Sequence, residues 1–166
     1  MGMKTLEGDE AFYYLHNGNE LMGMVLSHVD DFTIAGCEVF VKDVIKTIER
    51  ELTVSKVEQN SFGFTGVDVK KTENSIEVSM EDYVESLQEV KNIRTAKKND
   101  ELLPSEMKLF RGYTGKIAWL ADNVRPDMSY SALEMTKKGR KATITDMKKV
   151  NQAIRKIKDQ LETHIK

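Results

Sequence analysis

Alternating apolar and polar positions dominate the first half of the chain and predict antiparallel strands. The runs AFYYL (11–15) and ELMGMVLSHV (20–29) are separated by residues 16–19, whose Asn-Gly pair tolerates the positive φ of a tight hairpin turn. The second run leads into Asp30-Asp31, and a further short apolar run, FTIAG, follows at once. We therefore expect the two aspartates at the tip of a strand reversal.

Helical spacing begins after this reversal. Apolar residues recur three and four positions apart between residues 38 and 52, which predicts an amphipathic helix. FGFTGVDVKK (62–71) and SIEVSM (75–80) predict a second hairpin, and Ser79 is expected to cap a helix over residues 80–90. Residues 11–79 are thus predicted to form an antiparallel sheet that is covered by the helices at 38–52 and 80–90.

The rest of the chain has the pattern of helices. Residues 91–103 mix charges without periodicity and lead to Pro104, a residue type that often begins a helix. Pro126-Asp127 is expected to open another helix and Thr145 to cap the last one, whose predicted apolar stripe is Met147, Val150, Ile154, Ile157 and Leu161. The predicted fold class is α+β, with a sheet-forming lobe at residues 1–95 and an all-helical lobe at 104–166.

Composition excludes several classes of protein. No segment reaches the roughly 18 apolar residues of a membrane-spanning helix, and the first residues lack the basic-then-apolar order of a signal peptide. The single cysteine, Cys37, cannot form an internal disulfide, and with three well-separated histidines no Cys/His zinc site can be assembled. We expect no membrane partner and an intracellular, reducing environment.

The net charge of -2 conceals a strong asymmetry along the chain. Residues 1–135 hold 15 basic and 24 acidic side chains, whereas residues 136–166 hold 10 basic and 3 acidic ones. Clustered cations are typical of phosphate binding, because neutralised phosphates release counterions. A solvated lysine-rich helix face is the alternative meaning of the same pattern. The candidate contacts to a nucleic-acid backbone are Lys137, Lys138, Arg140, Lys141, Lys148, Lys149, Arg155 and Lys156.

Paired aspartates at a hairpin tip also have a chemical interpretation. Nucleotidyl transfer by two metal ions needs hard oxygen ligands on a rigid element, and Mg²⁺ is the ion that such ligands prefer. Palm-type polymerases use a strand, an aliphatic residue, two aspartates and a second strand, which is the order around Asp30 and Asp31. An Asp-Asp pair alone is weak evidence, because most such pairs are solvated turn residues.

Several blocks in a consistent order resemble the reverse transcriptases of copia-type long-terminal-repeat retrotransposons. HVDDFTIAG is similar to their Asp-Asp hairpin, and FGFTGVDVKKTENSIEVSMEDYVESL is similar to the block that approaches the primer end and begins the thumb. FRGYTGKIAWLADNVRPDMSYSALEM resembles a later block of the family, with matches at Gly115, Trp119, Leu120, Ala121, Arg125, Pro126 and Asp127. The sequence departs from the family pattern at Thr65, Met80-Glu81 and Asn123-Val124.

The resemblance implies a palm-like sheet with covering helices and then a thumb-like helical lobe, derived from an RNA-directed DNA polymerase. Asp30 and Asp31 would be the catalytic and metal-binding residues. In the family the fingers and the first catalytic aspartate precede this hairpin, and they have no counterpart in this sequence. We therefore expect only weak Mg²⁺ binding unless another chain completes the site, and no polymerase activity by the chain alone.

Two functions remain open at this stage. One is an enzyme-derived fragment that contacts an RNA or DNA backbone and meets a polypeptide carrying the missing palm and fingers. The other is a domesticated interaction or structural module within a host protein complex. Among single residues, Trp119 is expected to anchor the core, Arg125 to pair with Asp127 beside Pro126, and His28 to pack beside the hairpin.

Overall fold

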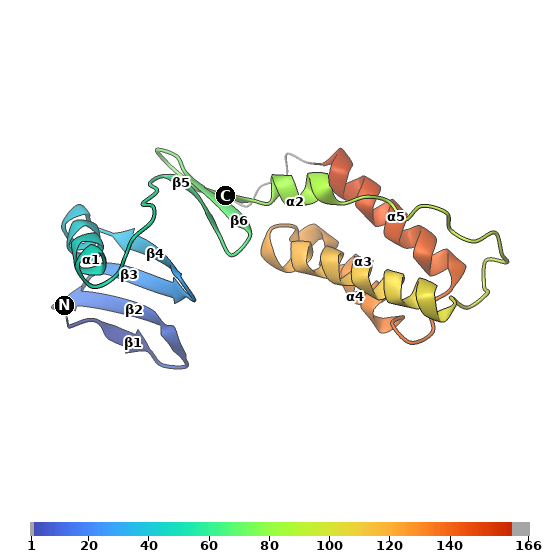
Figure 1. Ribbon diagram of the computed structural model, residues 1–166, viewed down its shortest axis with the longest axis horizontal. Helices are drawn as coiled ribbons and strands as arrows, with labels where there is room; N and C mark the ends of the chain where they lie inside the picture. Colours follow the sequence, from blue (N-terminus) through green and yellow to red (C-terminus); the bar gives the residue numbers. More distant parts are fainter. Residues whose placement is uncertain (1, 161–166) are drawn as a thin grey trace. The chain divides into compact units, whose positions relative to one another are not determined.

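The computed structural model describes residues 2–160, which form an α+β fold with antiparallel sheets (Figure 1). The α+β class and the antiparallel pairing expected from the sequence are confirmed. The chain divides into two compact units, Met1–Gln59 and Asn60–Lys166. Each unit is described separately below.

The first unit is a four-stranded sheet with one helix. Neighbouring strands are antiparallel, and their order in the sheet follows the chain. The hairpin predicted around residues 16–19 is present, with Asn17 opposite Glu20 and a positive φ at Gly18. The elements are β1 (Lys4–Leu6), β2 (Asp9–Asn17), β3 (Glu20–His28), β4 (Asp31–Gly36) and α1 (Glu38–Glu51).

Helix α1 packs closely on this sheet because two glycines face it. Gly23 of β3 and Gly36 of β4 are cross-strand partners. A Cβ atom added to Gly23 would lie 2.2 Å from the Phe40 ring, and one added to Gly36 would lie 2.6 Å from the Met22 carbonyl oxygen. Phe40 therefore occupies the space that two side chains would fill, and it forms the centre of the small core with Val25 and Val44.

The second unit combines a three-stranded sheet with a set of helices. Strand β6 lies between β5 and β7 and is antiparallel to both. The strands are β5 (Ser61–Phe64), β6 (Val67–Lys71) and β7 (Ile76–Ser79). The helices are α2 (Glu81–Ser86), α3 (Pro104–Asn123), the 3-10 helix η1 (Pro126–Met128), α4 (Ser129–Lys137) and α5 (Ile144–Asp159).

A single apolar core joins α2 and the following segment to the three long helices. Met80, Val84, Leu87 and Val90 belong to the same buried cluster as Phe110, Ile117, Leu120, Ile154 and Ile157. The segment at Val90 is also held by Asn151 of α5, whose Oδ1 accepts from the Val90 backbone N–H at 2.8 Å and whose Nδ2 donates to the Val90 carbonyl at 3.1 Å. Residues 80–90 therefore complete the core of the helices.

The prediction of one sheet across residues 11–79 is wrong, because the described residues hold two separate sheets. Residues 53–59 form neither strand nor helix, so the first sheet is not continued through this stretch. The compact units divide after Gln59, and Met80, Val84, Leu87 and Val90 are buried in the same core as the helices. The FGFTGVDVKK segment is itself a hairpin, which reverses at Thr65-Gly66.

The predicted starts of two helices are also incorrect. Thr143, and not Thr145, caps α5: its Oγ1 accepts from the Asp146 N–H, and its own N–H donates to Asp146 at 2.9 Å. This capping box needs an acidic residue three positions after the cap, and only Thr143 has one. Ser79 ends β7, and α2 begins after Met80 without a side-chain cap. Leu161 of the predicted α5 stripe lies outside the described residues.

The Gly36 contact generates a first prediction. In Gly36→Ala the new Cβ would meet backbone atoms at 2.6 and 2.7 Å, which can move only if the sheet shifts. We expect the first unit to lose about 2 kcal/mol of stability, as is typical of an overpacked core. Hydrogen exchange of the amides in β3 and β4, read by mass spectrometry, measures this loss. Gly63→Ala is the control, because its Cβ would make only an ordinary contact at 3.8 Å; equal protection in both variants would contradict the prediction.

Candidate nucleic-acid interface

The two aspartates of the first unit lie at a hairpin tip, as the sequence predicted. His28 of β3 pairs with Asp31 of β4, so Val29 and Asp30 form a two-residue loop. Val29 has a φ of 52° and is 87% exposed. A β-branched residue in this left-handed region is strained, by roughly 1–3 kcal/mol in general. The hairpin thus places both carboxylates in water beside a strained turn.

The residues present do not fit a two-ion magnesium centre. Asp30 and Asp31 are both exposed. Between residues 2 and 160, no group of three or more His, Cys, Asp or Glu side chains is arranged to hold a metal ion. Two neighbouring carboxylates can bind Mg²⁺ only weakly, with water as most of its ligands. A second ion would need a further carboxylate from elsewhere.

Helix α5 separates an apolar side from a basic side. Met147, Val150, Ile154 and Ile157, which the sequence predicted to form the apolar stripe, are buried. Successive residues of an α-helix are about 100° apart around its axis. The side opposite the apolar stripe therefore carries six residues, all of them exposed: Lys148, Lys149, Gln152, Arg155, Lys156 and Asp159. We call this set the outer face of α5. It brings together four of the eight predicted contact residues.

The other four predicted contact residues lie just before α5. Lys137 ends α4 and Lys138 caps it, and Arg140 and Lys141 lie in the turn that follows. All four are exposed. Lys138 and Lys149 both act on Asp146: burial raises the pKa of this carboxyl, but hydrogen bonds from Thr143 and these two cations lower it overall. Cations of the turn and of the first residues of α5 therefore act on the same carboxylate.

Carboxylates accompany the cations of this surface. The ion pairs are Lys137 to Glu134 at 2.9 Å, Lys149 to Asp146 at 3.7 Å, Arg155 to Glu89 at 3.5 Å and Lys156 to Asp127 at 3.7 Å. The basic partners are all more than half exposed, and such surface pairs contribute little stability and are screened by salt. The eight cations still exceed these four carboxylates and Asp159, so the surface keeps a positive charge.

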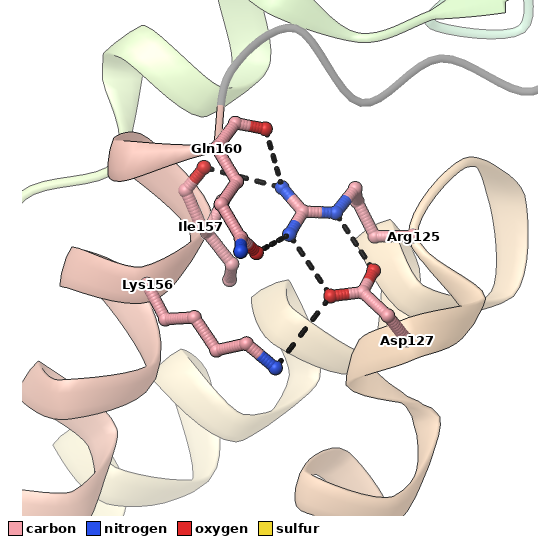
Figure 2. A network of polar contacts seen from close by, with 5 residues as sticks. All are labelled: Arg125, Asp127, Lys156, Ile157 and Gln160. Carbon is pink, nitrogen blue, oxygen red and sulfur yellow. Dashed lines mark hydrogen bonds and ion pairs between the residues drawn. The ribbon is translucent and has the colours of Figure 1, made fainter.

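A buried arginine fixes the end of α5 (Figure 2). Arg125 is 2% exposed, and its Nε and Nη2 donate to the two oxygens of Asp127 at 2.8 and 3.0 Å. Its Nη1 donates to the carbonyls of Ile157 and Gln160, and Nη2 also donates to Gln160 Oε1. The predicted Arg125–Asp127 pair is confirmed. The guanidinium is enclosed by these acceptors, so it is a structural group and not a phosphate contact.

The remaining predicted residues have different environments. Trp119 was expected in the core but is 45% exposed, because the buried side of α3 is formed by Phe110, Thr114, Ile117, Leu120 and Ala121. Pro126 begins η1, as expected for its fixed φ. Cys37 is exposed at the start of α1, and His28 is exposed at the end of β3. The sequence analysis missed Asn151 and Gln160, whose roles depend on contacts with distant residues.

Comparison with protein-family models, with curated proteins and with solved structures gives no match for this chain. No helix in the described part of the chain combines the length and the apolar character that crossing a membrane requires.

The Arg125 network predicts a pH-dependent contribution to stability. Hydrogen bonds from Arg125, and its charge and that of Lys156, hold the pKa of Asp127 below its usual 3.8 despite partial burial. A lowered folded pKa means that the contribution is complete above the unfolded pKa and is lost as the pH falls through the folded one. Asp127→Asn should cost about 1 kcal/mol at pH 7, allowing for the exposure of Asp127.

Urea unfolding of the wild type and Asp127→Asn between pH 7 and pH 2.5 tests this prediction. The difference between the two proteins should shrink below about pH 4. Asp122→Asn, an exposed change on α3, is the control and should leave stability unchanged. A difference that stays constant with pH would show that the ionised Asp127 carboxylate contributes nothing.

The Asp30–Asp31 geometry predicts the outcome of a polymerase assay. Two-metal catalysis holds the ions about 3.5–4 Å apart between several carboxylates, and one exposed pair cannot do this. The isolated chain should give no primer extension with Mg²⁺ or Mn²⁺ on a primed RNA template, measured by gel electrophoresis. Template-dependent incorporation that disappears in Asp30→Ala would refute this expectation.

Proposed function

We propose that this chain is a nucleic-acid-binding module, related to the palm and thumb of copia-type reverse transcriptases, that contacts the phosphate backbone through the outer face of α5 and the turn before it. The single observation that carries the proposal is the gathering of Lys148, Lys149, Arg155 and Lys156 on one exposed side of a helix whose other side is buried. The chain has no polymerase activity of its own in this proposal.

The spacing of these cations suits a polyanion. Lys148 and Lys149 lie about two turns before Arg155 and Lys156, which corresponds to about 10 Å along an α-helix. Phosphates along one nucleic-acid strand are several ångströms apart, so the two pairs can meet different phosphates. The exposed side chains are long and mobile enough to adjust, which favours contact with a backbone over recognition of bases.

The family resemblance is a second support for the proposal. The first unit has the hairpin with paired aspartates, and the second has the helices that carry the Arg-Pro-Asp block. In this proposal Asp30 and Asp31 are remnants of a metal site that bind Mg²⁺ weakly unless another polypeptide supplies the missing carboxylate. RNA or DNA is the partner of the basic surface, and a protein carrying the missing palm and fingers is a further partner.

A domesticated protein-interaction module is the second candidate. The observation in its favour is the exposed face of α3, where Leu109 and Trp119 are each 45% exposed. Gly112 and Gly115 lie between them on the same helix, and a Cβ at either would meet no atom within 4 Å. In this candidate the cations of α5 face water or an acidic protein, and the carboxylates near them limit their attraction for phosphate.

Salt-dependent binding separates the two candidates. A labelled RNA–DNA hybrid is titrated with wild type and with Lys148/Lys149/Arg155/Lys156→Ala at two salt concentrations. We expect a wild-type Kd on the order of 10⁻⁴ to 10⁻⁶ M at physiological salt, and weaker binding at the higher salt. The variant should bind more weakly and should lose roughly one unit of the log–log salt slope for each cation that contacts a phosphate.

A matched variant controls for net charge. Lys42/Lys46/Lys56/Lys70→Ala removes the same charge from exposed positions elsewhere and should bind nearly as wild type does. Equal effects of the two quadruple variants would show that only net charge matters. Undetectable or salt-insensitive binding by the wild type would refute the nucleic-acid function and favour the interaction module.

A further inference from the structure

The second half of the outer face of α5 is hollowed. A shallow, open depression of about 410 Å³ is lined by Gln152, Arg155, Lys156, Asp159 and Gln160. The five lining side chains carry two cations, two amides and one carboxylate. Lys148 and Lys149, which lie at the other end of the same face, take no part in it.

We propose that this depression seats one phosphate group of the bound nucleic acid, with Arg155 and Lys156 as its cationic partners and the amides of Gln152 and Gln160 as neutral donors. This inference rests on the proposed function but is more specific. It divides the outer face into a phosphate-seating end and an end, at Lys148 and Lys149, that acts by charge alone.

The two cations are held over the depression by weak pairs that a phosphate can replace. Arg155 Nε lies 3.3 Å from the Asn151 carbonyl and 3.5 Å from Glu89, and Lys156 lies 3.7 Å from Asp127. Both cations are more than half exposed, so these pairs are screened by water and salt. A phosphate oxygen accepts stronger charge-assisted hydrogen bonds and can exchange with them at small cost.

Gln160 is oriented as a donor by the buried arginine. Its Oε1 accepts from Arg125 Nη2 at 3.2 Å, so the Nε2 group is the end of the amide left to donate (Figure 2). Arg125 thus acts as a positioning residue for the depression. The same network also holds Asp127, which pairs with Lys156 at 3.7 Å.

The lining fits a phosphate better than other anions or a metal ion. The two cations and the two amides together carry more hydrogen-bond donors than the coplanar oxygens of one carboxylate can accept. The oxygens of a phosphate point in several directions and can accept from more of these donors. A metal ion is disfavoured, since Asp159 is the only carboxylate in the lining. Asp159 also repels an anion, and its removal should therefore strengthen binding.

Two charge-matched double variants and one neutral variant test the proposal. Binding of the labelled RNA–DNA hybrid is measured for Lys148/Lys149→Ala and Arg155/Lys156→Ala, each of which removes two charges from the same face. The second should weaken binding about tenfold more than the first. Gln152→Leu removes no charge, and we expect it to weaken binding roughly tenfold, the effect of one hydrogen bond to a charged group, with the salt slope unchanged.

Carboxylate removal provides a measurement that does not depend on a loss of binding. Asp159→Asn and Glu134→Gln remove one negative charge each, inside and outside the depression, and Asp159→Asn should strengthen binding more. Thermal unfolding followed by circular dichroism confirms that each variant is folded. A Gln152→Leu that binds as wild type, together with equal losses in the two double variants, would overturn the phosphate seat and leave the proposed function intact. Undetectable binding by the wild type would refute both.

Discussion

The buried guanidinium of Arg125 sets the strictest requirement in the second unit. A buried cation is costly unless it is paired and all of its hydrogen-bond donors have acceptors. The donors of Arg125 meet both Asp127 oxygens, two carbonyls at the end of α5 and the Gln160 side chain. Removing the arginine would leave the buried carbonyl group of Ile157 without this donor, which costs about 1–3 kcal/mol. The chain between α3 and α4 and the end of α5 are consequently fixed together.

This requirement also links structure to the candidate function. Arg125 holds Asp127, which lies 3.7 Å from Lys156, and it holds Gln160 through its Oε1 atom. Lys156 of the outer face and Gln160, which follows α5, are therefore oriented by a group that the ligand never meets. The opposite end of α5 is fixed by the Thr143–Asp146 capping box. A helix secured at both ends can present its cations at constant spacing, which a flexible lysine-rich segment cannot do.

Local patterns in the sequence predicted most of the elements, and long-range packing decided what the sequence could not show. The stripe of α5, the hairpin at Asp30-Asp31 and the Arg125–Asp127 pair all depend on residues close in sequence, and all are present. The separation into two sheets was missed because the alternating pattern predicts strands but does not show which of them belong to one sheet. The exposure of Trp119 was missed because a large aromatic residue was assumed to be buried, although Leu120 and Ala121 already supply the buried side of α3.

The candidate site also depends partly on local sequence and partly on long-range contacts. Spacing alone identifies the four cations of the outer face, because 100° per residue is a local property of a helix. The depression beside Arg155 and Lys156 depends in addition on the orientation of Gln160, which is set by a residue 35 positions away.

Charge along the chain adds a final constraint on any nucleic-acid contact. Residues 1–59 carry 5 basic and 11 acidic side chains, whereas residues 60–166 carry 20 basic and 16 acidic ones. At physiological salt the Debye length is about 8 Å, so phosphates at the outer face of α5 respond mainly to nearby charges. At lower salt the screening length is greater, so a larger part of the chain's net charge of -2 contributes. Carboxylates already pair with Lys149, Arg155 and Lys156, and a measured salt slope smaller than the number of cations on the face is the natural consequence of these pairs.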